Sequence, residues 1–261
     1  MGRLIKVDFL KIIKDKLFLI FAIVILGLSI VSPLLTYALQ RIMAGIEGAE
    51  DFIPVIDVRS NLFVSFNITG SSGLIALILF SVLAIKERGG YAKNKITNGF
   101  SRRDIFLSLT LVLFILYVSI LLVAMLITMS INFIFYPYSV NGYLFIEDIP
   151  YLLINFLAAI LMSALVISMI MFFAVGCGIK VAPLIIAVAF IVLSLLGSAL
   201  SVVDSQTTRY LNTIFNPAYL MDSMGSDGTT QLLIGWFVSI PVYIFLFLFS
   251  GFGIFNKKDL L

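Results

Sequence analysis

The chain has 261 residues, of which 61% are hydrophobic and only 12% are charged. A soluble domain is roughly half apolar and a quarter charged, and several apolar runs here exceed the roughly 18 residues that indicate a membrane-spanning helix. The chain has no histidine and a single cysteine, Cys177, which excludes an intrachain disulfide, a Cys/His zinc site and catalysis by histidine, while a net charge of +3 does not indicate a nucleic-acid partner. We therefore expect an all-α polytopic membrane protein.

Residues 1–16 predict an amphipathic helix at the cytoplasmic membrane surface. At 100° per residue, one arc of this helix is apolar and the other is basic. The apolar arc, which would face the lipid, holds Ile5, Phe9, Ile12 and Ile13. Such a helix lies in the headgroup layer with its apolar side toward the acyl chains. The alternative is that these residues only form the basic flank that orients the first span.

Six spans follow, in one transmembrane domain over residues 17–255, with a cytoplasmic tail at 256–261. The predicted spans are 17–40, 70–85, 105–135, 151–176, 181–203 and 232–255. The third would be about 46 Å long if wholly helical. Since this exceeds a hydrocarbon core of about 30 Å, that helix must tilt, bend or protrude. Pro241 lies inside the sixth span and predicts a kink or a local break there.

The basic residues are divided unequally between the two sides of these spans. With six alternating spans, fourteen lysines and arginines lie on the side of the N-terminus and three on the other. Cytoplasmic segments of membrane proteins carry the excess of basic residues. This asymmetry predicts that both termini and the loop 86–104 are cytoplasmic.

The predicted spans contain no aspartate, glutamate, lysine, arginine or histidine. Ion-coupled carriers commonly place an ionisable residue at mid-membrane, so this composition weighs against such a carrier and against intramembrane hydrolysis by paired carboxylates. The chain also has no GxxxxGK[ST] phosphate loop. If the protein performs transport work, the energy has to come from another subunit.

The loop 86–104 predicts a short helix presented to the cytosol. Positions 92–97 can form the helix, and Asn98-Gly99 is a stop signal. Ser101 then caps the next helix, whose first turn carries Asp104. Apolar residues recur in this basic segment at near-helical spacing, namely Tyr91, Ile96 and Phe100. This pattern is typical of a short helix that binds in a groove of a partner protein.

The same segment resembles the coupling loop of the permease subunits of ATP-binding-cassette (ABC) type-2 exporters. That family commonly shows the pattern E…G…I…G.SR before its third span, and the matching residues here are Glu87, Gly90, Ile96, Gly99, Ser101 and Arg102. The ending FNKKDLL, 255–261, is similar to the family's basic tail, whereas Phe100 stands where proline or valine is frequent. The resemblance extends over the whole chain in architecture and over about 20 residues in motif.

The resemblance implies that 86–104 docks in a cleft of a separate cytosolic ABC ATPase. ATP and magnesium would then bind to that partner and no cofactor to this chain, and two permease chains, identical or homologous, would pair in a bacterial plasma membrane. Glu87 and Arg102 would anchor the segment, with Gly99 and Ser101 shaping it. The groove of the ATPase would be filled by Tyr91, Ile96 and Phe100.

The apolar spans favour an amphipathic or lipid-soluble cargo, such as an antimicrobial peptide exported for self-immunity. Three alternatives remain at this point. A scaffold or sensor would use 86–104 to bind a cytosolic partner without transport, and a secondary carrier would need a coupling-ion site. A membrane-embedded enzyme would need converging acids, histidines or cysteines.

Overall fold

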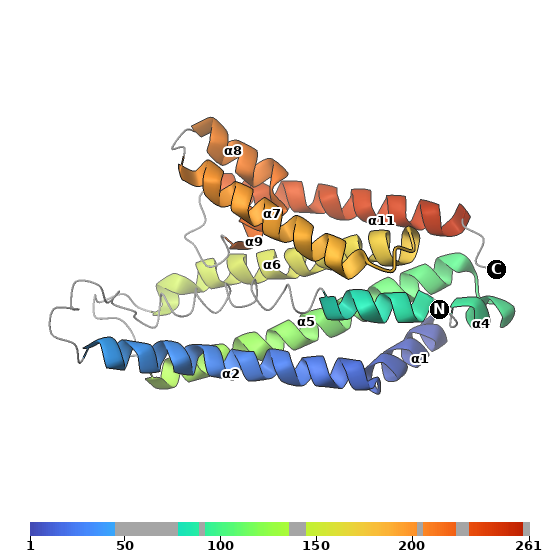
Figure 1. The fold of residues 1–261 in the computed structure, drawn as a ribbon, viewed down its shortest axis with the longest axis horizontal. Helices are drawn as coiled ribbons and strands as arrows, with labels where there is room; N and C mark the ends of the chain where they lie inside the picture. Colours follow the sequence, from blue (N-terminus) through green and yellow to red (C-terminus); the bar gives the residue numbers. More distant parts are fainter. Residues whose placement is uncertain (45–77, 89–91, 136–144, 203–205, 223–229, 258–261) are drawn as a thin grey trace.

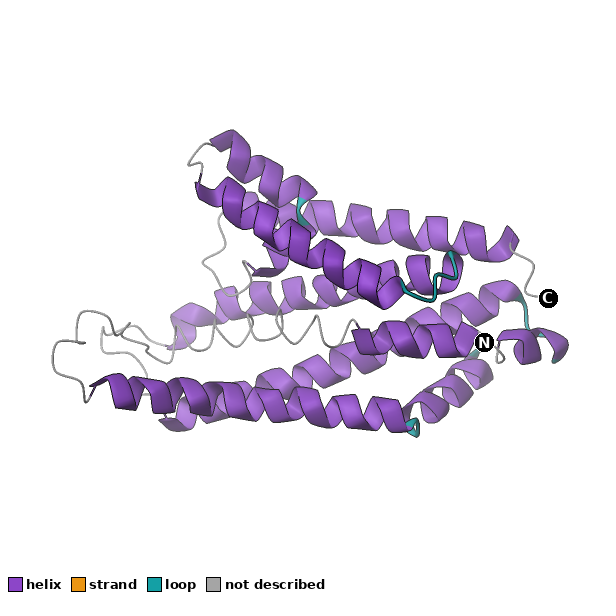
Figure 2. Ribbon diagram, viewed as in Figure 1, coloured by secondary structure: helices purple, strands orange, loops and turns teal. Residues whose placement is uncertain are grey.

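The structure is a computed structural model that describes residues 1–44, 78–88, 92–135, 145–202, 206–222 and 230–257. All regular elements in these ranges are helical (Figure 2). They are α1 (Gly2–Ile13), α2 (Lys16–Ala44), a helix at 78–88, α4 (Ala92–Thr97), α5 (Arg102–Phe135), α6 (Phe145–Ile170), η3 (Met171–Gly176), α7 (Ala182–Val202), α8 (Gln206–Phe215), α9 (Pro217–Asp222), α10 (Thr230–Ile234), η4 (Gly235–Ser239) and α11 (Ile240–Lys257). The elements η3 and η4 are π-helical.

Five helical stretches are long and apolar enough to cross a membrane. They are Lys16–Leu39, Arg102–Phe135, Leu152–Gly176, Ala182–Leu200 and Gln231–Lys257. These stretches match the first, third, fourth, fifth and sixth predicted spans within a few residues at each end. The helix 78–88 covers the later part of the predicted second span, whose first residues, 70–77, lie outside the described residues.

The longest helix, α5, is the centre of the bundle. At 34 residues it is about 51 Å long, and it packs against α1, α2, α6 and α11 (Figure 1). Val112, Leu113 and Leu116 on its inner face are at most 3% exposed. The N-terminal helix α1, the short helix α4, the start of α5 and the end of α11 lie together at one end of the molecule, which we call the α4 end (Figure 1).

Two of the long apolar stretches contain a π-helical turn, η3 in one and η4 in the other. The element η4 ends directly before α11, where Pro241 has no N–H for the helix ladder. One extra residue in the preceding turn is a common way for a long helix to absorb such an interruption. The local break predicted at Pro241 is therefore present as this π-helical turn.

A glycine contact joins η3 to α11. A Cβ atom added to Gly176 would lie 2.8 Å from the carbonyl oxygen of Gly251, and one added to Gly251 would lie 3.0 Å from the Cα of Phe172. Small residues allow helix backbones to approach closely inside membranes, where association depends on packing. The pair Gly176 and Gly251 thus sets the distance between η3 and α11.

The helices α8 and α9 fold back against α7 and η4 (Figure 1). The buried amide of Asn216 donates to the carbonyl oxygen of Leu193 at 2.8 Å, and its oxygen accepts the backbone N–H of Tyr219 at 3.1 Å. Asn216 therefore caps α9, with Pro217 at the first helical position, where a missing N–H costs little. The indole of Trp236 donates to the carbonyl oxygen of Leu220 at 3.2 Å. These bonds hold the α8–α9 hairpin in place between α7 and η4.

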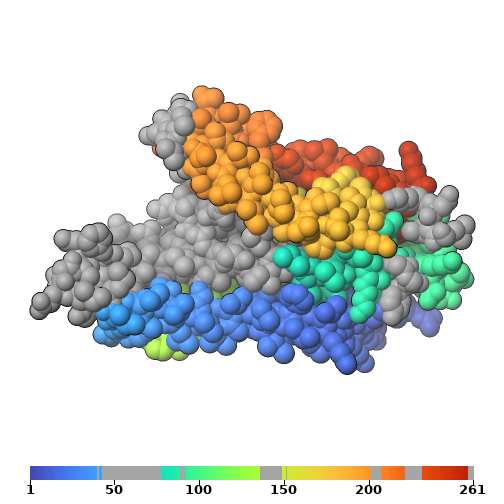
Figure 3. All heavy atoms as spheres, in the orientation of Figure 1, coloured from blue at the N-terminus to red at the C-terminus, as the bar shows by residue number. Residues whose placement is uncertain are grey.

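One side of α7 lies on the surface of the molecule (Figure 3). Its exposed aliphatic side chains recur along the helix, at Leu184, Ile185, Val188, Ile191, Val192, Leu195 and Leu196. A continuous apolar surface of this kind is the surface that a membrane-spanning helix presents to lipid or to another membrane helix.

Candidate functional site

The α4 end carries a cluster of ion pairs that joins four segments distant in sequence. Glu87, from the helix 78–88, is only 5% exposed. Its carboxylate is 2.6 Å from the Nζ of Lys11 on α1. Burial lowers the pKa of the Lys11 amine, and the hydrogen bond and charge of Glu87 act in the opposite direction. This pair joins α1 to the start of the loop 86–104, directly after the predicted second span.

Asp8 is the second acid of the cluster, and it is completely buried. One of its carboxylate oxygens is 2.7 Å from the Nζ of Lys95 on α4. The other accepts the hydroxyl of Ser108, on α5, at 2.8 Å. Since Lys95 is also 4.0 Å from Glu87, a single lysine of α4 lies between two buried acids. We refer to Asp8, Lys11, Glu87, Lys95 and Ser108 as the α4 ion cluster.

Sequence reasoning missed Asp8 and Ser108, although the sequence contains a signal for Asp8. At 100° per residue Asp8 lies between Leu4 and Ile12, at the edge of the apolar arc of α1. A charged residue in that position needs a partner when the arc is buried. The partners, Lys95 and Ser108, are 87 and 100 residues away, so the sequence does not identify them.

The apolar arc of α1 packs against the protein. Ile5, Phe9 and Ile13 are half-buried on the core. Ile12 is 1% exposed, which corrects the expectation that it faces lipid. The same periodicity fits both outcomes, because an apolar arc does not distinguish a lipid surface from a protein surface. The exposed apolar side chains of α1 are Val7 and Leu10.

The turn between α4 and α5 has the predicted chemistry. Gly99 has a φ of +85°, its N–H bonds to the carbonyl oxygen of Ile96, and the N–H of Phe100 bonds to that of Lys95. These two bonds form a Schellman motif, which ends α4. Ser101 accepts the N–H of Asp104 at 3.1 Å and donates its hydroxyl to that carboxylate at 2.7 Å. The stop at Gly99 and the cap at Ser101 are therefore confirmed.

The other predicted docking residues lie as follows. Tyr91 is outside the described residues, and Ile96 and Phe100 are half-buried against the core of this chain. Arg102 donates to the carbonyl oxygen of Asn256 at 2.7 Å, which joins the start of α5 to the end of α11. The solvent-facing surface of α4 is polar and consists of Lys93, Asn94 and Thr97.

Arg88 extends the connections of the α4 end to the turn between η3 and α7. Its guanidinium lies against Gly178, where an added Cβ would be 1.7 Å from Nη1. Gly178 also has a φ of +70°, a conformation that glycine adopts without strain. The end of the 78–88 helix therefore contacts both α1 and the turn between the fourth and fifth predicted spans.

The pair of Lys86 and Asp15 gives a testable dependence of stability on pH. Asp15 also accepts the N–H of Leu17 at the start of α2. The hydrogen bond from Lys86 holds the pKa of Asp15 below its usual value, against the opposing effect of burial. A carboxylate with a lowered pKa stabilises the fold above its unfolded-state pKa, and this contribution is lost as pH falls through the folded-state pKa.

We expect Asp15→Asn to lower the melting temperature at pH 7, because this variant removes the pair with Lys86. The difference from wild type should begin to narrow as the pH falls below the usual pKa of aspartate, and it should disappear as the pH falls through the lower pKa of the folded state. Melting curves in detergent across this pH range provide the measurement, with Lys14→Gln as the surface control. A difference that is constant with pH would contradict the assignment.

Comparison of the chain with protein-family models, curated proteins and solved structures gave no match. Among the described residues no group of three or more histidine, cysteine or acidic side chains could hold a metal ion.

Proposed function

We propose that the chain is the permease subunit of an ABC exporter in a bacterial plasma membrane, and that it couples to a separate ATPase subunit through 86–104. The observation that carries this proposal is the placement of α4. This short helix lies between two apolar helices and exposes a polar side. Its inner side is joined to α1 and to the 78–88 helix by ion pairs.

Such a helix is suited to transmit a displacement. A force applied to α4 acts on Lys95, and through Asp8 on both α1 and α5, because the carboxylate contacts both Lys95 and Ser108. Buried ionic contacts resist separation, since each unpaired charge would be left in a poorly solvated site. α5 then extends the displacement across the full thickness of the membrane.

The half-burial of Ile96 and Phe100 changes which residues we propose as the contact with the ATPase. The resemblance to ABC permeases implies that these side chains fill a groove of the ATPase, but in the structure they pack on the core of this chain. We propose that Lys93, Asn94 and Thr97 form the exposed contact surface. Tyr91, which lies outside the described residues, keeps its predicted role in docking. Ile96 and Phe100 would fix the position of α4 relative to the helix bundle by packing on its core.

The double variant Lys93→Glu/Asn94→Trp is expected to abolish copurification of a phosphate-loop ATPase with the tagged chain. Both side chains are exposed, so the fold is retained while a charge and a bulky ring oppose docking. The measurement is a pull-down in mild detergent followed by ATP hydrolysis in the eluate, and we expect at least a tenfold loss. Lys6→Glu, an exposed lysine of α1, is the matched control.

Two results would contradict the docking proposal. One is a wild-type chain that purifies alone without nucleotide hydrolysis, which would favour a scaffold or sensor. The other is an ATPase that is retained equally by the double variant and the control, which would place the contact outside α4. An Ile96→Asp variant serves as a comparison that also disturbs the core.

We propose an amphipathic peptide or another lipid-soluble molecule as the cargo, because the spans are apolar throughout. A second permease chain would pack on the exposed side of α7. Deletion of the gene is expected to sensitise cells to at least one membrane-active peptide, measured as the minimum inhibitory concentration over a panel. Unchanged sensitivity to the whole panel would contradict the peptide assignment.

A further inference from the structure

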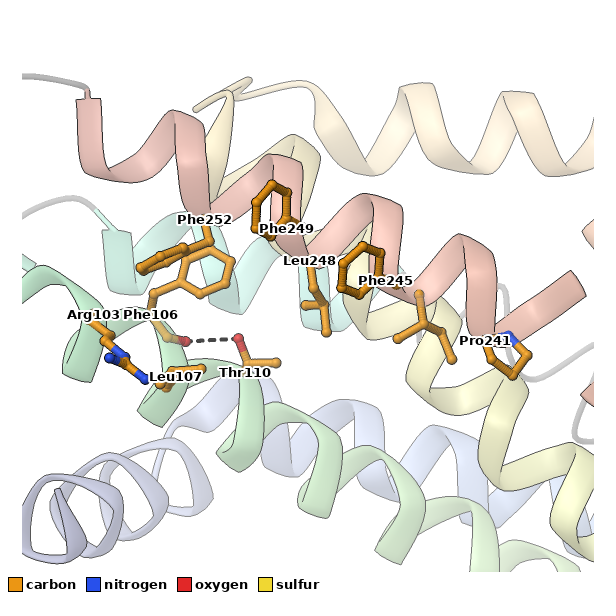
Figure 4. A pocket seen from close by; sticks show the side chains of 10 residues that line it. Arg103, Phe106, Leu107, Thr110, Pro241, Phe245, Leu248, Phe249 and Phe252 are labelled. Atoms are coloured by element: carbon orange, nitrogen blue, oxygen red, sulfur yellow. Dashed lines mark hydrogen bonds between the residues drawn. The ribbon is translucent and has the colours of Figure 1, made fainter. Parts of the chain in front are cut away.

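An apolar groove runs between α5 and α11 and is open at the surface of the bundle (Figure 4). Its volume is about 570 Å³, within the range of roughly 300–1,000 Å³ that is usual for ligand pockets. The walls are formed mainly by leucine, isoleucine and phenylalanine side chains of the two helices. They are Phe106, Leu107, Thr110, Pro241, Ile244, Phe245, Leu248, Phe249 and Phe252, with Arg103 at one end.

The groove has the length of one membrane leaflet. Its α11 side runs from Pro241 to Phe252, which is about 16 Å along a helix. Half of a hydrocarbon core of about 30 Å is about 15 Å. An acyl chain of a phospholipid therefore matches the groove in length as well as in polarity.

Polarity along the groove is confined to the end that holds Arg103. The hydroxyl of Thr110 is bonded to the carbonyl oxygen of Phe106 at 2.8 Å, so it is already satisfied (Figure 4). Arg103 is exposed in the first turn of α5, at the α4 end, where basic residues gather. None of the described carboxylates forms an ion pair with Arg103, whereas Lys11, Lys86 and Lys95 each have one. This guanidinium is therefore available to an anion at the level of the lipid headgroups.

Two aromatic side chains of the groove wall are largely uncovered by the rest of the protein. Phe245 and Phe249 are 65% and 67% exposed, and they stack on each other with centroids 5.6 Å apart. At the Arg103 end, Phe106 and Phe252 meet with centroids 5.7 Å apart and close the floor. The groove is thus already formed without a ligand, and a bound acyl chain would cover the exposed faces of Phe245 and Phe249.

We propose that this groove binds one anionic phospholipid, with an acyl chain along the α5–α11 wall and the phosphate at Arg103. Basic pockets between membrane helices on the cytoplasmic side characteristically bind anionic headgroups. A second copy of the chain fits less well. A two-fold axis along the membrane normal at this groove would bring two Arg103 side chains to the same depth, where like charges repel. The inference is independent of any ATPase, and it uses only the predicted orientation in the membrane.

Native mass spectrometry of the full chain in detergent tests the proposal. The probes are phosphatidylglycerol and phosphatidylcholine with the same palmitoyl and oleoyl chains. We expect one phosphatidylglycerol retained with about a fivefold preference, which corresponds to one arginine near the surface. Arg103→Gln should reduce the preference to about one, while Arg103→Lys should keep most of it. Arg3→Gln, an exposed arginine at the same end, is the matched control and should not change it.

Groove-filling variants test the acyl-chain site separately from the headgroup contact. Thr110→Trp should remove the retained lipid of either headgroup, and Leu107→Phe provides a smaller change if the first variant folds poorly. A wild type without preference, or an Arg103→Gln variant that keeps it, would overturn the proposal. So would a groove-filling variant that retains the lipid. A second copy in the groove would instead appear as a dimer that dissociates in the filled variant, which also overturns the proposal.

Discussion

Replacing Asp8 with alanine is expected to lower the free energy of unfolding by about 3–5 kcal/mol, the usual cost of removing one partner of a buried ion pair. The carboxylate is completely buried and contacts both Lys95 and Ser108. Without it, the Lys95 ammonium remains in a site where it is 13% exposed, and among the described residues its remaining acidic partner is Glu87 at 4.0 Å. The measurement is an unfolding curve in detergent, monitored by the intrinsic fluorescence of the protein.

A double-mutant cycle separates the ion pair from the loss of packing. Asp8→Ala/Lys95→Ala should be less destabilised than the sum of the two single variants, because the stranded charge is also removed. Lys6→Ala, on the exposed side of α1, should be close to wild type. Additive single-variant effects would show that the two groups are not coupled.

Gly176→Ala is expected to destabilise the protein by about 1–3 kcal/mol, the usual cost of overpacking a well-packed interior. The added methyl would collide with the backbone carbonyl of Gly251 at 2.8 Å, and a backbone atom cannot rotate away as a side chain can. A loss of stability would be evidence for the close contact, because helix propensity alone favours alanine over glycine by about 0.5–1 kcal/mol and would make the variant more stable. Melting temperature and the yield of monodisperse protein provide the measurements.

The glycines of α11 supply the controls for this prediction. Gly251→Ala, with its nearest atom at 3.0 Å, should have a smaller effect of the same sign. A Cβ at Gly253 would meet nothing within 4 Å, so Gly253→Ala should be neutral or slightly stabilising. If the two alanine variants at 176 and 253 behave alike, the close approach of η3 and α11 is not what sets stability there.

Much of the helical architecture could be predicted, because it depends on local sequence. The lengths of the apolar runs predicted five long helices that are present in the structure. Gly99 and Ser101 predicted where α4 ends and where α5 begins. Pro241 predicted a break by the loss of one backbone donor. Each of these features is determined by residues within a few positions of one another.

The candidate site was only partly predictable, because its contacts are long-range. The loop 86–104 was identified, but the pairing of Lys95 with Asp8 depends on how α1 packs against α5. Periodicity placed Ile12 and Ile96 on apolar faces without revealing that those faces turn toward this chain. The same limit applies to the α5–α11 groove, whose two walls are more than 130 residues apart in sequence.

The α4 ion cluster imposes an order on biogenesis. Asp8 is synthesised 87 residues before Lys95 and 100 residues before Ser108. At about 5–20 residues per second, its carboxylate waits roughly 5–20 s for its partners to be synthesised. During this interval α1 cannot dock, since burying an unpaired carboxylate is unfavourable. The helix α1 is the first to be made, yet it takes its final position only after the third predicted span has begun to emerge from the ribosome.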